Sequence, residues 1–303
     1  MRAIITGATG AVGMALISEL ISRECETLVL LREGSQRAER IPSHPAVKRI
    51  FCSLDDISEL STGNERYDVF FHLAWEGTSG SARDDMRLQV KNIMRTVDAA
   101  ELAARLGCSV FVGAGSQAEY GRTTFALSSR TPTFPENAYG MAKLCAGQMS
   151  RAMCGKLGVR HVWARILSVY GPYDNERSLI PTVIKKLLSG ERVALTKGEQ
   201  TWDYVYSADA ARALVSVALD GRDGGVYCIG SGVSRPLREY IETVRDMIDS
   251  EGKLGFGDIP YSEEQVMHLG ADIFELVRDT GYAPSTSFED GIAKTISFYR
   301  GRE

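Results

Sequence analysis

Residues 6–13 read Thr6-Gly7-Ala8-Thr9-Gly10-Ala11-Val12-Gly13, directly between a short apolar run and a helical pattern. Glycines at this spacing have separate uses where a strand turns into a helix: Gly7 permits the tight turn, Gly10 leaves room for a pyrophosphate, and Gly13 lets the helix pack closely. The N-terminus of that helix offers backbone amides and the positive end of its dipole to an anion. The stretch therefore predicts a dinucleotide-binding turn. Its expected cofactor-binding residues are Gly7, Thr9, Gly10, Ala11, Val12 and Gly13.

Around this turn, short apolar runs alternate with longer helical patterns through the first half of the chain. We expect strands at 3–6, 27–31, 48–52, 69–74, 109–113 and 159–166. We expect helices at 13–22, 84–106 and 139–157. Strands that alternate with helices indicate parallel strands joined by crossover helices. The expected fold class is therefore α/β, a Rossmann-type doubly wound parallel sheet, in which ligands bind beyond the carboxyl ends of the strands.

The pattern changes after residues 170–172, which read Tyr-Gly-Pro. Loops become longer, helices become shorter, and proline and glycine interrupt them more often. We expect residues 1–168 to form an NAD(P)-binding Rossmann domain, with a return of the chain to it near 203–230. The remaining stretches, 169–202 and 231–303, are expected to form a smaller, discontinuous C-terminal lobe that binds the substrate.

The composition excludes several classes of protein. The net charge of −4 offers no broad basic surface to nucleic acid or to anionic lipid. No apolar run approaches the roughly 20 residues that cross a bilayer, and the first strand leaves no room for a signal peptide. Six scattered cysteines without a close CxxC pair favour buried reduced thiols over a disulfide framework or a metal site. We expect a cytoplasmic protein that acts on a small molecule, without nucleic-acid or membrane partners.

The end of the second expected strand bears on the choice of cofactor. An acidic residue there would bind a free ribose hydroxyl, whereas an arginine suits a 2′-phosphate. The chain has Arg32 at this turn, with Ser35 and Arg37 nearby, and the expected acid is absent. This favours NADP. NAD stays an alternative, because Glu33 follows directly and because Arg32 can be no more than a solvated loop charge.

The candidate catalytic residues lie in two separate stretches. Tyr139 and Lys143 are four residues apart at the start of an expected helix, so their side chains share one face. A tyrosine has an ordinary pKa near 10, and a neighbouring ammonium and a positive nicotinamide ring would lower it. Lys143 can also hold the ribose of the nicotinamide. Upstream, Ser116 follows the fifth strand, where a carbonyl or hydroxyl oxygen of a substrate must be held.

These residues resemble the extended short-chain dehydrogenase/reductase family, the sugar-nucleotide epimerases, dehydratases and reductases. The resemblance runs through nearly the whole chain, and it rests on the glycine turn, residues 71–74, Ser116, Tyr139, Lys143, residues 165–172, 200–206, 271–273 and 281–284. It implies hydride chemistry through Ser116, Tyr139 and Lys143. It implies further cofactor contacts from Ser53, Leu54, Leu73, Ala74, Trp75, Ile166 and Val169, and substrate contacts from Ser116, Gln117, Ser168 and Trp202. Members of this family often pair through the helices expected at 84–106 and 139–157, which implies a homodimer.

Four departures from the family pattern narrow the function. Family dehydratases carry an Asp-Glu pair where this chain has Gln117 and Ala118, and neither of these side chains is an acid or a base. Trp202 stands where many epimerases have an arginine that contacts the diphosphate, so another cation, Arg177 or Arg235, would have to replace it. Ser168 stands where the family has an asparagine. Ser53 stands where the family often has an acid near the adenine.

The sequence thus predicts an NAD(P)-dependent oxidoreductase of nucleotide-activated sugars. Its similarity to reductases lies in residues 116–121 and 200–204, so the expected reaction is reduction of a 4-keto-6-deoxy sugar nucleotide. An NAD-dependent 4-epimerase is the alternative within the enzyme class. A non-catalytic, cofactor-sensing regulator is the alternative outside it, and the presence of both Tyr139 and Lys143 argues for the enzyme.

Overall fold

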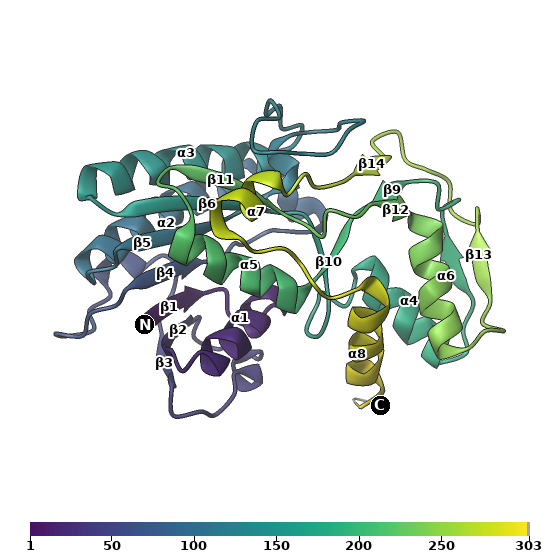
Figure 1. The fold of residues 1–303 in the computed structure, drawn as a ribbon, viewed down its shortest axis with the longest axis horizontal. Helices are drawn as coiled ribbons and strands as arrows, with labels where there is room; N and C mark the ends of the chain where they lie inside the picture. The colour runs from purple at the N-terminus through teal and green to yellow at the C-terminus, as the bar shows by residue number, and fades with distance from the viewer. Residues whose placement is uncertain (302–303) are drawn as a thin grey trace.

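A seven-stranded parallel sheet forms the centre of the structure, a computed structural model that describes residues 1–301. Its strands are β1 (Arg2–Thr6), β2 (Glu26–Leu31), β3 (Val47–Phe51), β4 (Val69–His72), β5 (Val110–Ser116), β6 (Arg160–Ile166) and β11 (Gly225–Ile229). They lie in the order β11-β6-β5-β4-β1-β2-β3, and every neighbouring pair is parallel (Figure 1). The predicted doubly wound α/β fold is confirmed.

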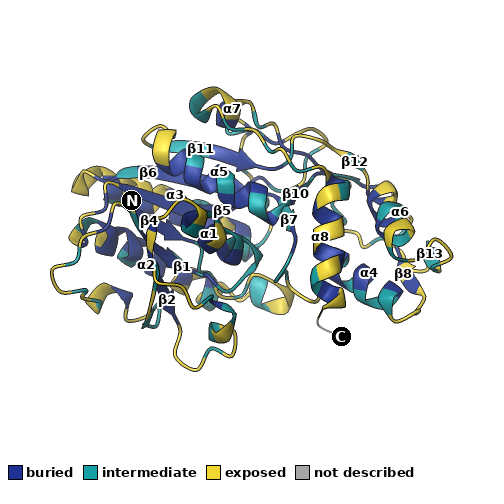
Figure 2. Ribbon diagram, turned by 60° about the horizontal axis from the view of Figure 1, so that its bottom comes forward, coloured by how far each residue is buried: buried dark blue, intermediate teal, exposed yellow. Residues whose placement is uncertain are grey.

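Helices cover both faces of this sheet (Figure 1). They are α1 (Ala11–Ser22), α2 (Met86–Arg105), α3 (Ala138–Leu157) and α5 (Ser207–Asp220). Successive residues of a strand point to opposite faces, so Ala3 and Ile5 pack into the core beneath α1 and α5, whereas Ile4 packs into the core beneath α2. Both cores are mainly apolar at the sheet, which explains why most of the strands read as hydrophobic runs (Figure 2).

The second half of the chain adds a smaller layer of helices beside the sheet (Figure 1). Its elements are β7 (Ser168–Tyr170), α4 (Leu179–Leu188), β8 (Val193–Leu195), β9 (Thr201–Trp202), β10 (Tyr204–Tyr206), β12 (Arg235–Pro236), α6 (Leu237–Ile248), β13 (Leu254–Phe256), β14 (His268–Leu269) and α8 (Phe288–Arg300). Between β14 and α8 the chain returns to the main sheet, where α7 (Phe274–Thr280) packs against α5 and β11. Helices α4, α6 and α8 share an apolar core of their own, in which the Phe288 ring lies 5.0 Å from Tyr170 and 4.6 Å from Tyr240, between ring centroids. The predicted division into two domains stays a prediction.

The structure moves several predicted boundaries, and one of these changes matters for the site. Strand β5 was expected to end at residue 113, but it continues to Ser116, which pairs with Ile166 of β6. The glycines at 113 and 115 resemble a loop in the sequence. In the fold they are required, because a side chain at either position would collide with Trp163 of the neighbouring strand. Ser116 is therefore held rigidly as the last residue of a central strand.

Two expectations from composition can be compared with the structure. Four of the cysteines are buried as expected, at positions 25, 108, 154 and 228, but Cys145 is exposed and Cys52 is half-buried. Among residues 1–301, all six cysteines are free thiols. No helix in the described part of the chain is long and apolar enough to cross a membrane.

Candidate active site

The glycine turn between β1 and α1 is shaped for close approach of another molecule. Gly7 has a φ of +74°, and a side chain there would lie 2.5 Å from the backbone nitrogen of Ala74. A side chain at Gly13 would lie 2.5 Å from the carbonyl oxygen of Gly7. A side chain at Gly10 would meet nothing within 4 Å, so the first turn of α1 faces open space. Because that turn also contains no acidic residue, its free amides suit an anion such as a pyrophosphate.

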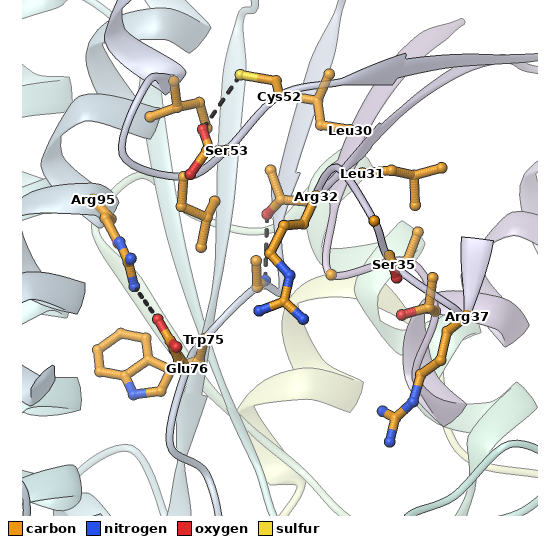
Figure 3. Close-up of a pocket in the computed structure, with 18 of the residues that line it drawn as sticks. Leu30, Leu31, Arg32, Ser35, Arg37, Cys52, Ser53, Trp75, Glu76 and Arg95 are labelled. Atoms are coloured by element: carbon orange, nitrogen blue, oxygen red, sulfur yellow. Dashed lines mark hydrogen bonds and ion pairs between the residues drawn. The ribbon is translucent and has the colours of Figure 1, made fainter. Parts of the chain in front are cut away.

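A cavity of about 690 Å³ opens beside this turn, at the carboxyl ends of β1, β2, β3 and β4 (Figure 3). Its volume falls in the range of small-molecule sites, roughly 300–1,000 Å³. Seven of the residues predicted to bind the cofactor line it, namely Gly7, Thr9, Arg32, Ser53, Leu54, Ala74 and Trp75. Other predicted contacts are not in this wall, namely Gly10, Ala11, Val12, Gly13, Leu73, Tyr139, Lys143, Ile166 and Val169. The cavity therefore fits the adenosine half of a dinucleotide best.

Two arginines at the rim of this cavity are available to a ligand. Arg32 directly follows β2, and its guanidinium lies toward the middle of the cavity (Figure 3). Arg37 lies on the same loop. Both are exposed, and within residues 1–301 neither side chain forms a hydrogen bond or an ion pair. Two cations without a protein partner suit a phosphate group.

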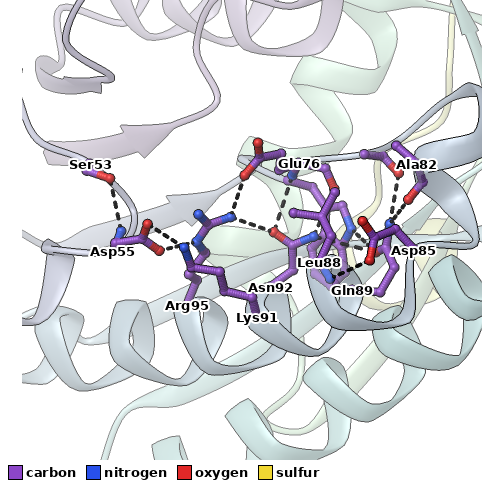
Figure 4. Close-up of polar contacts among 12 residues, drawn as sticks. Ser53, Asp55, Glu76, Ala82, Asp85, Leu88, Gln89, Lys91, Asn92 and Arg95 are labelled. Atoms are coloured by element: carbon purple, nitrogen blue, oxygen red, sulfur yellow. Dashed lines mark hydrogen bonds and ion pairs between the residues drawn. The ribbon is translucent and has the colours of Figure 1, made fainter.

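The opposite wall carries a charge network that the sequence did not reveal (Figure 4). The guanidinium of Arg95, on α2, contacts Asp55 at 2.8 Å and Glu76 at 2.9 Å. Lys91 contacts the other oxygen of Asp55 at 2.7 Å. Hydrogen bonds from Arg95 and then Lys91 lower the pKa of Asp55 to about 2. The acid two residues after Ser53 is thus paired with α2, whereas Ser53 itself lines the cavity.

Ser116, Tyr139 and Lys143 come together from two elements. Helix α3 is capped by Asn137, whose side chain accepts a hydrogen bond of 2.8 Å from the amide of Gly140, so Tyr139 lies in its first turn. Lys143 lies one turn later and donates a hydrogen bond of 2.7 Å to the carbonyl oxygen of Ala114, in β5. Its ammonium is 5.9 Å from the centroid of the Tyr139 ring. The predicted shared face is therefore present, and β5 fixes the lysine.

Burial dominates the protonation of both residues. Burial raises the pKa of the Tyr139 phenol, although hydrogen bonding with Ser116 and the charge of Arg83 act in the opposite direction. The expectation that this pKa is lowered is wrong for the protein alone, because desolvation of the phenolate outweighs the nearby cations. Burial also lowers the pKa of Lys143 to about 7, opposed by the carboxylate of Glu119. A bound cofactor would add the positive nicotinamide ring to this balance.

Ser116 is held by the turn that follows it, the 3-10 helix η4 (Gln117–Glu119). Its hydroxyl donates to the Gln117 amide oxygen at 2.7 Å and accepts from the amide of Ala118 at 3.2 Å. Its backbone amide donates to the Glu119 carboxylate at 2.8 Å, and that carboxylate is fully buried against Arg165 at 2.6 Å. Sequence reasoning missed Glu119, since nothing local distinguishes it from an exposed acid.

Trp75 forms an aromatic wall between the cavity and the catalytic residues. The Lys143 ammonium lies 3.8 Å from the centroid of the Trp75 ring, and Tyr139 meets that ring edge-on at 6.1 Å. The indole nitrogen donates to Gln89 at 2.9 Å, which ties the loop after β4 to α2. Trp75 is half-buried and lines the cavity, as expected of the cofactor contact predicted for it.

A second cavity, of about 530 Å³, lies between β7, β8 and α6, and two of the residues predicted to bind the substrate line it. Trp202 and Ser168 both line it, and the indole nitrogen of Trp202 donates to the Ser168 hydroxyl at 2.7 Å. Val169, predicted to bind the cofactor, also lies in this wall. Ser116 and Gln117 lie outside it.

The second cavity lacks the cation that the sequence led us to expect. Among the described residues that line it there is no lysine or arginine. Of the two substitutes considered, Arg235 contacts Glu289 at 2.7 Å, and Arg177 is exposed outside the lining. Burial raises the pKa of Asp174, which does line the cavity, to about 6. The wall therefore suits a largely uncharged part of a substrate.

Comparisons with known proteins place these features in a family. A sequence model described as the NAD dependent epimerase/dehydratase family matches residues 3–230. The chain is 25% identical to dTDP-glucose 4,6-dehydratase of Escherichia coli over 334 residues, covering 99% of this chain and 92% of that protein. It is 24% identical to dTDP-4-dehydro-6-deoxyglucose reductase of Escherichia coli over 314 residues, covering 98% and 97%.

A solved structure gives the same picture at the level of the fold. The UDP-N-acetylglucosamine 4-epimerase from Methanobrevibacter ruminantium M1, solved with UDP-N-acetylmuramic acid, superposes with a TM-score of 0.89. The match covers 100% of this chain and 99% of that chain, at 22% identity. A dehydratase, a reductase and an epimerase are thus similar to this chain to nearly the same degree, so overall similarity does not select one reaction.

Proposed function

Because the chain belongs to the NAD-dependent epimerase/dehydratase family, we propose that it transfers a hydride to the sugar of a nucleotide-activated sugar. The specific reaction proposed is reduction of a 4-keto-6-deoxy sugar nucleotide by NADPH. One observation carries this: Ser116, Tyr139 and Lys143 meet beside the cofactor cavity, while the two positions after Ser116 hold no acid or base. Such a site is equipped to add a hydride and a proton, but not to eliminate water.

In this reaction each side chain has a separate task. NADPH, when bound, supplies the hydride to the carbonyl carbon. The electron pair of the carbonyl bond then moves to oxygen, which takes the proton of the Tyr139 phenol. The Ser116 hydroxyl gives up its hydrogen bond to Gln117 and donates to that oxygen instead. Because the backbone of Ser116 is fixed at the end of β5, this needs only a rotation of the serine side chain. Lys143 holds the nicotinamide ribose and places positive charge near the phenolate.

A direct experiment tests the proposal. The protein is incubated with NADPH and a panel of 4-keto-6-deoxy sugar nucleotides that differ in their base, and oxidation of the cofactor is followed by its absorbance. We expect stoichiometric oxidation with at least one member of the panel. Interconversion of 4-epimers without net oxidation would instead identify a 4-epimerase that recycles bound NAD. Cofactor binding without turnover of any sugar nucleotide would favour the cofactor-sensing regulator.

The first prediction concerns the preference for NADP(H) over NAD(H). Arg32 and Arg37 are exposed cations at the cavity rim, so Arg32→Ala removes one charge-assisted contact to a 2′-phosphate. Such a contact is worth about 1.5–3 kcal/mol, so NADPH should bind roughly tenfold or more weakly, while NADH binding changes little. Titration of both cofactors measures this. Equal or tighter binding of NADH by the unaltered protein would overturn the preference.

The second prediction is that the protein does not dehydrate hexose nucleotides. Elimination of water needs a titratable pair beside the sugar, and Gln117 and Ala118 cannot exchange protons at neutral pH. Incubation with NAD and nucleotide-activated glucoses, followed by mass spectrometry, should show no loss of water. Formation of a 4-keto-6-deoxy product by the protein alone would contradict the assignment.

The assembly and location of the protein stay predictions from the sequence: a homodimer in the cytoplasm. Exposed apolar side chains on α2 and α3 support the homodimer. These residues are Met86, Val90 and Met94 on α2, and Met141 and Met149 on α3. On α2 they are four residues apart, so they form one apolar stripe on the outer face of the helix.

A further inference from the structure

A loop that carries no motif brings an arginine to the catalytic tyrosine. After β4 the chain passes through Trp75 and then the 3-10 helix η3 (Gly80–Arg83) before α2 begins. The Arg83 guanidinium lies 4.5 Å from the centroid of the Tyr139 ring. A cation over the face of an aromatic ring is attracted by the electron density of that face. This contact joins two segments more than 50 residues apart in the chain.

Hydrogen bonds hold the loop that brings Arg83 to Tyr139. The Gln89 amide, which is buried on α2, donates to the carbonyl oxygens of Gly77 and Ala82 at 2.9 Å each (Figure 4). The Arg83 guanidinium itself donates to the carbonyl oxygen of Thr78 at 3.4 Å. One residue of α2, Gln89, therefore holds the loop at two points, and one of these points immediately precedes Arg83.

Arg83 also keeps its full charge available. Within residues 1–301 it forms no ion pair with a carboxylate. Of the two acids that follow Arg83, Asp84 is exposed and forms no ion pair with it within residues 1–301. Asp85 caps α2 instead, accepting from the amides of Arg87 and Leu88 at 3.1 Å each. An arginine that is half-buried, held in place and unpaired beside a titrating group acts on the charge of that group.

The other charged and polar groups that face Tyr139 are already committed. Lys143, on α3, donates to the Ala114 carbonyl and is close to losing its charge at neutral pH, since burial lowers its pKa to about 7. Glu119, on η4, opposes ionisation of the phenol, and the Ser116 hydroxyl favours it. Arg83 is thus the cation in contact with the ring whose charge does not depend on pH in the physiological range.

We propose that Arg83 serves Tyr139 as a second cation, a positioning residue whose guanidinium stays over the ring and favours the phenolate that remains after proton transfer; this rests on the function proposed above. In the reductive direction it helps the phenol to give up its proton. In the reverse direction it helps the phenol to be ionised before the sugar hydroxyl is oxidised. Nothing in the spacing of the sequence places an arginine of this loop beside α3.

The third prediction tests this with a signal that needs no substrate. The ring carbon that bears the hydroxyl is labelled with carbon-13 in all tyrosines, and the Tyr139 signal is identified by its absence in Tyr139→Phe. In Arg83→Gln the Tyr139 phenol should titrate at higher pH than in the unaltered protein, and in Arg83→Lys at an intermediate pH. Arg87→Gln is the matched control, because Arg87 is exposed on the first turn of α2 and its side chain forms no hydrogen bond or ion pair within residues 1–301.

Kinetics give the second readout. With an accepted sugar nucleotide, Arg83→Gln should lose about tenfold in turnover at neutral pH, equivalent to about 1.4 kcal/mol of barrier. Reduction needs the protonated phenol, so the alkaline fall of the pH–rate profile should move to higher pH in this variant. The apparent KM should change little, since Arg83 acts on Tyr139 and not on the substrate.

The outcomes separate the two proposals. A Tyr139 titration that is unchanged in Arg83→Gln overturns the role of Arg83. The role is also overturned if, in the unaltered protein, Tyr139 does not titrate at any pH at which the protein stays folded. A raised KM with an unmoved profile also overturns it and makes Arg83 a substrate contact. If the titration moves as expected while no sugar nucleotide is turned over, the link between Arg83 and Tyr139 holds and the proposed function fails.

Discussion

Tyr139→Phe should lose at least about a hundredfold in turnover while it keeps its affinity for the cofactor. The phenol is the group proposed to give a proton to the carbonyl oxygen, and general acid catalysis contributes about 10²–10⁴ in rate. Phenylalanine preserves the ring, so the edge-on contact with Trp75 and the contact beneath Arg83 both remain. The measurement is turnover beside a cofactor titration, on the sugar nucleotide that the panel identifies. This is the fourth prediction.

A second tyrosine provides the control. Tyr67 precedes β4, at the amino end of that central strand and away from the carboxyl ends that form the site, and its hydroxyl donates to Glu65 at 2.6 Å. Tyr67→Phe also removes a phenolic hydroxyl, but it should leave turnover unchanged because the residue is remote from the site. Near-normal turnover in Tyr139→Phe would mean that another group supplies the proton, and the mechanism would have to be abandoned.

The fifth prediction is that Lys143→Met impairs both turnover and cofactor affinity. Lys143 is the group proposed to hold the nicotinamide ribose, so its loss acts on binding, whereas loss of the Tyr139 hydroxyl does not. Loss of hydrogen bonds from a charged donor costs about 1.5–3 kcal/mol, so cofactor affinity should fall roughly tenfold or more. Lys156→Met is the control, since Lys156 is exposed in the last turn of the same helix. Unchanged cofactor affinity in Lys143→Met would contradict the proposed contact between Lys143 and the nicotinamide ribose.

The stability of the same variant distinguishes a lost contact from a damaged fold. Burial lowers the pKa of Lys143 to about 7, so the charged amine is less stable inside the protein than in water. The unfolded chain keeps that proton up to a pKa of about 10.4, so this penalty is complete below about pH 7 and fades as the pH rises. Methionine carries no such penalty. Below about pH 7 the melting temperature of Lys143→Met should therefore match or exceed that of the unaltered protein, despite the lost bond to Ala114.

Local patterns in the sequence determined the fold class and much of the site. The glycine turn requires Gly7 because of its positive φ, and this requirement arises within one strand–turn–helix unit. The pattern of apolar residues along the chain predicts the alternation of strands and helices, because strands that are buried on both faces need continuous apolar runs. Tyr139 and Lys143 share a face because four residues make about one helical turn. Each of these features depends on neighbours in the chain.

Tertiary structure alone decided what surrounds those residues. Trp163 extends β5 to Ser116 by covering the glycines at 113 and 115, so a stretch that reads as a loop becomes a strand. The pairing of Asp55 with Arg95 and Lys91 ties the acid that follows Ser53 to α2. No period or spacing in the chain relates these partners, because they meet only when separate elements pack.

The electrostatics of the catalytic tyrosine show the same limit most clearly. From the sequence, Lys143 was the one side chain assigned to Tyr139 as a cation, and together with the positive nicotinamide ring it was expected to lower the pKa of the phenol. In the fold, burial raises that pKa, and Arg83 arrives from a loop anchored on α2. Spacing along a helix specifies which side chains share a face, but the cost of removing a charge from water depends on everything that packs around it. The pKa of Tyr139 therefore depends on contacts that form only in the folded chain.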